Sequence, residues 1–514
     1  MLSESLVKIT KGAGLAFTGS LVGLFLGFIN RTLITRCGTQ AEYGVYSLAL
    51  TILSICIVVA SLGLPSGLAR SVAYARGKQD RERIVALIPA ALQLALVAAI
   101  SLGIIVFFSS HVVAERIFHD HSLALPLRIF AWGIPVCCVT AILASAFGGF
   151  EDIKPQVYFA NTLVPLVFAP LLSLVALLRL PFTAVFYAYL ASLTISCIAM
   201  LVYARRRLPV QVRFFLPLWA NPVARELLLF SLPLLGLAML GLIIVWTDTL
   251  MLGGLKSSID VGLYNAAQPL AQFISTPLAA VGSIYLPVVS ALYAQGSMSE
   301  LRRNFSIITK WLCAATLPLF LVLFLFPQTV LAFVFGPAYS AAATALRILS
   351  LGFLMSNIMG PNGATLIAMG ETRFVMWTYL ATALLNVGLN MALIPPLGIE
   401  GAAIASASAL VSINMVIAWK LYSLAKAQPF SRNLIKPALA SLVLVFLFQF
   451  IFRNLVTVSW WMLPGLFILY YGIYGLAILF TRSFDREDIA MLLAIEKRVG
   501  MNLSFAKRIL RRFV

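Results

Sequence analysis

The sequence predicts an all-α membrane protein that crosses the bilayer many times. Of its 514 residues, 61% are hydrophobic and only 11% are charged, whereas a soluble globular domain has about 25% charged residues. Long apolar runs recur along the whole chain, and a transmembrane helix needs roughly 20 such residues. The runs lack the short polar–apolar alternation of a transmembrane barrel. The predicted class is therefore a polytopic helical bundle.

Fourteen segments are long and apolar enough to be transmembrane helices. The first follows Lys8 and Lys11, is too long for the core of a signal peptide and lacks a small-residue cleavage site, so no cleavable signal is expected. The fourteen segments begin near Gly14, Gly44, Ile84, Leu127, Val157, Phe182, Leu227, Leu263, Ile307, Ala345, Val375, Gly401, Ile435 and Trp460.

The net charge of +19 is explained by orientation in the membrane. With fourteen spans and a cytoplasmic N-terminus, the basic clusters at 76–83, 205–213, 302–303 and 497–512 all fall on the cytoplasmic side. This is the positive-inside asymmetry of membrane proteins. The prediction is a multi-pass protein of the cell membrane with both termini in the cytoplasm.

Short motifs of the first half recur in the second half, in the same order and at a nearly constant separation. They are YARG at 74–77 and YAQG at 293–296, LRI at 127–129 and 346–348, GVYSLA at 44–49 and GLYNAA at 262–267, and, more loosely, GFE at 149–151 and MGE at 369–371. The pattern predicts two duplicated halves of six spans each. Because six is even, both halves enter the membrane in the same orientation, as in transporters with parallel repeats.

The repeat divides the chain into four parts. We predict a first lobe at 1–208 and a second lobe at 209–428, which begins with a basic cytoplasmic linker. Two further spans at 429–482 have no counterpart in the repeat. The tail at 483–514 combines Ile489, Leu492 and Leu493 with many charges, which predicts an amphipathic helix on the inner leaflet.

Four arginines lie where the bilayer should disfavour them. Arg31 and Arg36 are near the outer end of the first span, and Arg128 and Arg347 occupy equivalent places near the outer starts of the fourth and tenth spans. Arginines near helix ends often extend to the headgroups. The symmetric pair is on the wrong side for the positive-inside rule, however, and guanidinium groups match phosphate oxygens. We predict a phosphate-binding site.

Asp248 is the one acidic residue deep in a predicted span. It occupies the place in the seventh span that the repeat gives to Arg31 in the first. Two interpretations remain open: an ion pair with one of the arginines, which is favoured, or binding of a coupling cation.

Polar side chains at four-residue spacing line one face of two spans. Such stripes either join helices through hydrogen bonds or offer a polar wall to a sugar. The candidates for sugar binding are Tyr264, Gln268 and Gln272 in the eighth span, and Asn386 and Asn390 in the eleventh, where Thr378 and Thr382 continue the stripe.

The sequence predicts no metal site and no cofactor. His111, His119 and His121 cluster near Glu115 and Asp120 in an outer loop, where solvated histidines are commoner than metal ligands. The six cysteines are scattered, mostly within apolar runs. A Gly-rich nucleotide loop is also lacking, so the chain itself is not expected to hydrolyse ATP.

Three stretches carry a family resemblance. Arg31 to Ala49 (RTLITRCGTQAEYGVYSLA), Asp248 to Ala267 and the loop Tyr74 to Arg83 resemble oligosaccharide flippases of the polysaccharide-biosynthesis (O-antigen flippase) type. That family belongs with the multidrug and toxin extrusion antiporters in one superfamily of exporters. The resemblance extends over nearly the whole chain.

The resemblance implies a V-shaped pair of six-helix lobes that opens alternately to each side. The implied activity is transport, not enzymatic: a polyprenyl phosphate or diphosphate carrying an oligosaccharide passes from the cytoplasmic to the outer leaflet, with Arg31 and Arg36 at the anionic head. Proton or sodium coupling is a family-level expectation, glycan-assembly enzymes are candidate partners, and a monomer is expected. Two alternatives stay open, a cation-coupled multidrug antiporter and a membrane glycan polymerase or glycosyltransferase.

Overall fold

The chain is a multi-pass helical membrane protein. The computed structural model describes residue 19 and residues 22–208, 222–428, 435–454 and 463–480, and all regular structure in these ranges is helical. Within them, nine helical segments are long and apolar enough to cross a membrane, and a bent pair, His121–Ala131 and Gly133–Gly149, makes a tenth. Leu177 and Phe108 are 81% and 76% exposed. Exposed apolar side chains on such helices fit a lipid environment.

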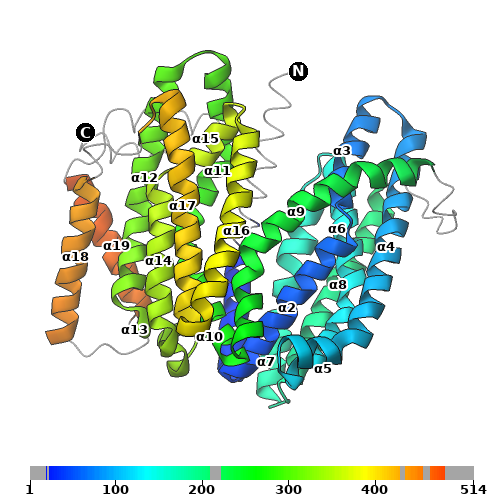
Figure 1. The fold of residues 1–514 in the computed structure, drawn as a ribbon, viewed down its shortest axis with the longest axis horizontal. Helices are drawn as coiled ribbons and strands as arrows, with labels where there is room; N and C mark the ends of the chain where they lie inside the picture. The colour runs from blue at the N-terminus through cyan, green and yellow to red at the C-terminus, as the bar shows by residue number, and fades with distance from the viewer. Residues whose placement is uncertain (1–18, 20–21, 209–221, 429–434, 455–462, 481–514) are drawn as a thin grey trace. The chain divides into compact units, whose positions relative to one another are not determined.

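The described residues form two compact units that divide between Asn265 and Ala266. Figure 1 labels the helices of both. The first unit contains a helix over 22–37, α2 (Gln40–Ala60), α3 (Leu64–Gly77), α4 (Arg81–Val112), α5 (Ala124–Ala131), α6 (Gly133–Gly149), α7 (Val164–Leu177), α8 (Thr183–Arg207), α9 (Pro222–Leu255) and the first half of α10 (Ser258–Gln272). The second contains the rest of α10 with α11 (Thr276–Ala294), α12 (Met298–Leu325), α13 (Pro327–Val334), α14 (Ala343–Ile358), α15 (Asn362–Ala368), α16 (Thr372–Leu397), α17 (Ile399–Ala425), α18 (Ile435–Asn454) and α19 (Leu463–Phe480).

The core of the first unit lies among α3, α4, α6 and α8. Leu68 of α3, Ile88 of α4 and Ile142 of α6 are each 0% exposed, and Met200 of α8 closes the same cluster. In the first unit α2, α4, α6 and α8 run beside one another as long rods (Figure 1). Burial of these aliphatic faces fixes the helices side by side through close packing.

The second unit packs its helices in a comparable way. Phe305 of α12, Leu366 of α15, Val375 of α16 and Ile417 of α17 form one buried cluster. A neighbouring cluster joins α11 to α12 through Tyr285 and Leu312. Figure 1 shows α12, α14 and α17 side by side in this unit.

Local sequence signals account for several helix boundaries. Thr39 caps α2, since its hydroxyl accepts from the Glu42 backbone N–H at 3.3 Å while the Glu42 carboxylate accepts from the Thr39 N–H at 2.8 Å. Between α2 and α3 the chain turns at Gly63, whose φ of +71° suits a residue without a side chain. Gly398, with φ of +58°, separates α16 from α17 in the same manner.

Helix boundaries recur with nearly the spacing of the sequence repeat. The helix α4 begins at Arg81, and its counterpart α12 begins at Met298. The helices α8 (Thr183–Arg207) and α17 (Ile399–Ala425) are a second such pair. These separations agree closely with the one between YARG at 74–77 and YAQG at 293–296. Interruptions of the helix recur as well: one separates α2 from α3, and another separates α10 from α11.

The compact units and the predicted lobes divide the chain at different places. The repeat predicts a lobe boundary at 208/209, whereas the units meet after Asn265 because α9 packs on α2, α3 and α4. The division into lobes at 1–208 and 209–428 stays a prediction. The linker at 209–221, the start of the first span and the tail at 483–514 lie outside the described residues.

Candidate substrate and coupling site

Arg31 and Arg36 lie on the helix over 22–37 and differ in burial. Arg31 is partly buried and Arg36 is exposed. Arg31 lies in the middle of this helix, whereas Arg36 lies in its last turn.

Asp248 is buried and hydrogen-bonded. Its side chain in α9 is 5% exposed, and its carboxylate accepts a hydrogen bond of 2.5 Å from the hydroxyl of Tyr264 in α10. Tyr264 is itself only 2% exposed. A carboxylate in a low-dielectric site needs such donors to remain charged. Two residues that the sequence suggested separately therefore form one contact.

A second polar pair is formed by the next residue of α9 and the next residue of α10. Thr249 and Asn265 are linked through the Asn265 side-chain amide, 3.1 Å from the Thr249 hydroxyl. The backbone carbonyl oxygen of Asn265 accepts from the Tyr43 hydroxyl of α2 at 3.2 Å. The sequence analysis did not select Tyr43, Thr249 or Asn265. The repeated motifs could have identified two of them, because Asn265 belongs to the GLYNAA motif and Tyr43 directly precedes GVYSLA.

The predicted repeat aligns residues of opposite charge and two tyrosines. Arg31 aligns with Asp248, and Tyr46 aligns with Tyr264. Asp248 accepts from Tyr264, and Tyr46 stacks on Phe168 with ring centroids 6.5 Å apart. The predicted repeat therefore pairs a basic residue of the first half with an acidic residue of the second.

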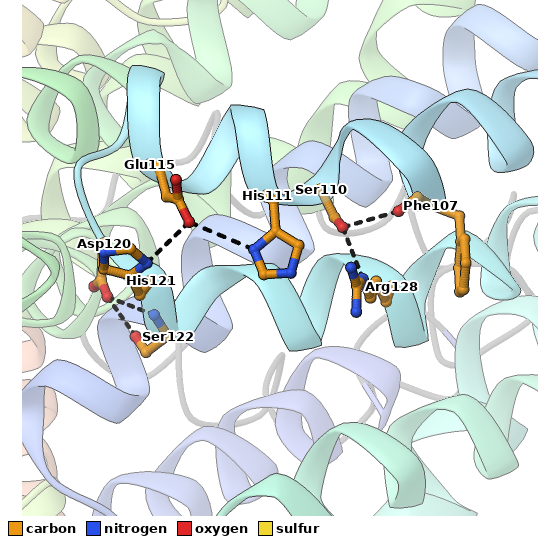
Figure 2. Close-up of polar contacts among 8 residues, drawn as sticks. All are labelled: Phe107, Ser110, His111, Glu115, Asp120, His121, Ser122 and Arg128. Carbon is orange, nitrogen blue, oxygen red and sulfur yellow. Dashed lines mark hydrogen bonds and ion pairs between the residues drawn. The ribbon is translucent and has the colours of Figure 1, made fainter.

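Arg128 is anchored to the end of the preceding long helix. Figure 2 shows its guanidinium beside α4, where Nε donates to the Ser110 hydroxyl at 3.0 Å. Ser110 in turn donates to the carbonyl oxygen of Phe107 at 2.8 Å, and the guanidinium carbon lies 5.7 Å from the centre of the Phe107 ring. These contacts place the cation beside the last turns of α4, before the helix continues into the π-helical turn Val113–Ile117.

Arg347 repeats this arrangement in the second unit. Its Nε donates at 3.0 Å to the carbonyl oxygen of Phe324, in the last turn of α12. Phe324 is in the part of α12 that corresponds to the end of α4. Both arginines therefore donate through Nε to the preceding long helix, Arg128 to a side-chain hydroxyl and Arg347 to a backbone carbonyl. Within the described residues, these hydrogen bonds use only the Nε atom of each guanidinium group. The two terminal guanidinium nitrogens are the atoms that a phosphate would engage.

The predicted polar stripes are buried to different degrees. In the second unit Gln268 is partly buried, whereas Gln272 is exposed. Asn386 and Asn390 of α16 are 3% and 0% exposed, and the Asn390 amide donates to the Asn386 side-chain oxygen at 3.1 Å. Hydrogen bonding within one helix leaves both interpretations of this stripe open, a sugar-facing wall or contacts between helices.

The histidine cluster surrounds a single carboxylate. Nδ1 of His121 and Nδ1 of His111 lie 3.1 Å and 3.5 Å from one carboxylate oxygen of Glu115 (Figure 2). All three side chains are substantially exposed. Over the described ranges, no group of three or more His, Cys, Asp or Glu side chains has a geometry that could hold a metal ion.

This fold, with cationic side chains near the ends of apolar helices, defines a multi-pass helical membrane protein. The model of the polysaccharide biosynthesis protein family matches residues 9–293, more than half of the chain, and the chain belongs to this family. A second model, MatE, matches residues 233–392.

Two relatives align over most of the chain. Stage V sporulation protein B of Bacillus subtilis is 24% identical over 459 residues, which cover 85% of this chain and 87% of the relative. A probable low-salt glycan biosynthesis flippase, Agl15, of Haloferax volcanii is 23% identical over 401 residues, or 78% of this chain and 80% of the relative.

Solved structures agree on the fold. The lipid II flippase MurJ in an inward closed conformation has a TM-score of 0.68 at 14% identity, over 91% of this chain and 97% of that structure. An inward-facing MATE family transporter of the MOP superfamily has a TM-score of 0.65 at 14% identity, over 81% and 98%. The family prediction made from the sequence is confirmed by the family match.

Proposed function

We propose that this chain is a flippase that moves a lipid-linked oligosaccharide from the cytoplasmic to the outer leaflet for cell-surface polysaccharide synthesis. The observation that carries the proposal is membership of the polysaccharide biosynthesis protein family, together with alignment along 78% of the chain to a glycan biosynthesis flippase. The activity is transport. The partners are the lipid-linked sugar and the surrounding membrane lipids.

The proposed architecture has fourteen spans, in two parallel six-span repeats that form a V and are followed by two further helices. The recurrence of helix boundaries at nearly the spacing of the repeated motifs supports the repeats. The placement of α18 and α19 at the last two predicted spans supports the count. Cytoplasmic termini in the cell membrane follow from the basic loops, and one chain with both repeats is proposed to act as a monomer.

Arg31, Arg36, Arg128 and Arg347 are proposed to bind the phosphate or diphosphate head. The anchoring of Arg128 and Arg347 through Nε supports this role for these two arginines. Tyr264, Gln268, Gln272, Asn386 and Asn390 are the proposed sugar contacts. Asp248 is proposed to balance the arginine charge, with proton or sodium coupling as the alternative.

The test is the sidedness of the lipid-linked oligosaccharide in cells depleted of this protein. Membrane-impermeant periodate oxidises sugars only on the accessible face. Cytoplasmic accumulation after depletion, reversed by wild type but not by Arg31→Ala inserted at equal level, is the expected result. Normal sidedness in depleted cells that lack another transporter for the same lipid would remove the proposal.

A multidrug antiporter is the second candidate. The MatE match at 233–392 and the MATE structures favour it, and Asp248 would then bind the coupling cation. Drug resistance on overexpression that is lost in Asp248→Asn would support this candidate. Unchanged drug sensitivity together with altered lipid sidedness would contradict it.

A further inference from the structure

The loop between α4 and α5 reaches from the first predicted lobe to the start of α10, which belongs to the second predicted lobe. The loop contains Asp120, the last residue before a short turn that leads into α5. The Asp120 carboxylate accepts a hydrogen bond from the hydroxyl of Ser258, the first residue of α10. The two residues are far apart in the sequence, so this bond links two separate segments of the first unit.

The loop holds Asp120 in a fixed orientation. One carboxylate oxygen of Asp120 accepts from both the backbone N–H and the hydroxyl of Ser122, at 2.9 Å and 2.6 Å (Figure 2). The backbone N–H of Asp120 donates to the Ala114 carbonyl at 2.9 Å. The second carboxylate oxygen is the acceptor for Ser258. The carboxylate therefore bridges its own loop and the start of α10.

Apolar contacts extend the same junction to the end of α9. Phe118 is only 7% exposed. A methyl group at Gly253 of α9 would lie 3.0 Å from the Phe118 ring and 2.5 Å from Leu48 of α2. A methyl group at the next residue, Gly254, would lie 3.6 Å from the Ile117 carbonyl oxygen. Small residues at the end of α9 thus allow the loop to pack directly on it.

The junction lies where α2 and α10 cross. A Cβ atom at Gly44 would overlap the carbonyl oxygen of Ser258, the residue that Asp120 binds. One at Gly262 would overlap the carbonyl oxygen of Gln40. Gly44 and Gly262 are equivalent positions of the repeat, so this crossing joins matching helices at the predicted outer ends of their spans.

We propose that Asp120 and Ser258 form a clasp that keeps the predicted outer end of the transporter closed and must release in each transport cycle. The proposal rests on the flippase function above. Asp120 and Ser258 are positioning residues: they hold the α2–α10 crossing and do not bind the lipid head. A hydrogen bond between a loop residue and a helix end is easily broken and remade, which suits a gate that alternates.

The first test is a reversible cross-link. Asp120→Cys with Ser258→Cys, in a Cys37→Ser background that removes the exposed native thiol, is oxidised in right-side-out vesicles, and flipping is followed by periodate accessibility of the lipid-linked sugar. We expect flipping to stop on oxidation and to return with dithiothreitol. The matched control, Glu115→Cys with His121→Cys, cross-links the loop to itself and should keep flipping. Full flipping by the oxidised clasp variant would overturn the proposal.

A second test does not depend on lipid transport. Val261 of α10 is 0% exposed, and Val261→Cys in the same Cys37→Ser background reports on opening through labelling by a membrane-impermeant maleimide. Asp120→Ala and Ser258→Ala should each raise the labelling rate roughly tenfold, as expected for loss of a hydrogen bond to a charged group. The variant with both changes should be labelled at nearly the same rate as either single variant, because both changes remove the same hydrogen bond.

The two measurements separate failure of the clasp from failure of the flippase assignment. Native Cys138, which is 0% exposed, controls for general unfolding and should stay unlabelled in every variant. Unchanged Val261→Cys labelling in Asp120→Ala would overturn the clasp even in a chain that flips lipid. Raised labelling in a chain that flips no lipid-linked sugar would retain the clasp and overturn the proposed substrate.

Discussion

Gly44 of α2 and Gly262 of α10 meet at a backbone-to-backbone crossing of two equivalent helices. A Cβ atom at Gly44 would lie 3.0 Å from the Gly262 nitrogen, and one at Gly262 would lie 3.1 Å from the Gly44 nitrogen. Both would come still closer to carbonyl oxygens of the opposite helix. Backbone cannot move aside as a flexible side chain can, so the glycines permit this separation and larger residues do not.

Gly44→Ala and Gly262→Ala should therefore force the helices apart. We expect a loss of stability of about 1–3 kcal/mol for each, as for overpacking of a tight contact, and a strong loss of flipping. Thermal unfolding in nanodiscs and the sidedness assay measure the two effects. The matched controls are Gly236→Ala and Gly241→Ala in α9, where an added Cβ meets nothing within 4 Å. If all four variants behave alike, the close crossing has no special importance.

The sequence predicted most of the spans but not how they break. Predicted starts near Val375 and Gly401 agree with α16 and α17, which begin at Thr372 and Ile399, because apolar length is a local property. The fourth span was predicted as one apolar segment beginning near Leu127, whereas the structure divides it into α5 and α6, which bend by 43°. Continuous hydrophobicity hides such a bend, and only the three-dimensional structure reveals it.

The candidate site was predicted residue by residue, without its contacts. Asp248 and Tyr264 were both selected from the sequence, but their hydrogen bond depends on how α9 packs on α10. Arg128 and Arg347 were paired by the repeat, yet their anchoring to the ends of α4 and α12 requires the tertiary structure. Tyr43, Thr249 and Asn265 were missed because neutral polar residues in apolar helices have many ordinary roles.

Charge and anchoring can be separated at Arg347. Arg347→Gln removes the charge and keeps hydrogen-bonding capacity, whereas Arg347→Lys keeps the charge and loses the planar fork. If the terminal nitrogens bind phosphate, Arg347→Gln should reduce flipping at least about tenfold, in line with loss of a charged hydrogen bond, and Arg347→Lys should retain part of it. Arg128→Gln and Arg128→Lys provide the equivalent pair in the other repeat.

A purely structural role gives a different pattern for these arginines. If Arg347 serves only to bind the Phe324 carbonyl, and Arg128 only to bind the Ser110 hydroxyl, flipping should follow thermal stability in all four variants. Melting temperature and flipping rate should therefore be measured on the same preparations. A Gln variant with wild-type flipping at unchanged expression would contradict the phosphate-binding proposal for that position.

Tyr264→Phe should destabilise the buried carboxylate of Asp248. The substitution removes the donor at 2.5 Å without changing the ring, and loss of a hydrogen bond to a charged group costs about 1.5–3 kcal/mol. Asp248→Asn tests the charge itself. For the favoured ion-pair interpretation, a double-mutant cycle of Asp248→Asn and Arg31→Gln should give a coupling energy of about 0.5–3 kcal/mol in unfolding experiments.

The cation-coupling interpretation predicts another outcome for Asp248. Flipping by Asp248→Asn would then lose its dependence on pH or sodium, and the cycle with Arg31→Gln would show additive effects. Transport rates in vesicles with and without imposed ion gradients decide between the two. Tyr379→Phe, at a tyrosine that is 45% exposed on α16, serves as the control for loss of a tyrosine hydroxyl.

The clasp carboxylate should make stability depend on pH only under acidic conditions. Burial raises the pKa of Asp120, but hydrogen bonds from Ser122 and Ser258 and the nearby His121 outweigh it, so the pKa lies below the ordinary value of 3.8. A depressed pKa contributes stability above the unfolded-state value, and this contribution is lost as pH falls through the folded value. The stability difference between wild type and Asp120→Asn should thus be constant above about pH 5 and shrink below about pH 4. Melting curves across this acidic range and up to neutral pH test this, and a difference that instead grows on acidification would show that Asp120 is not held as a carboxylate by its hydrogen bonds.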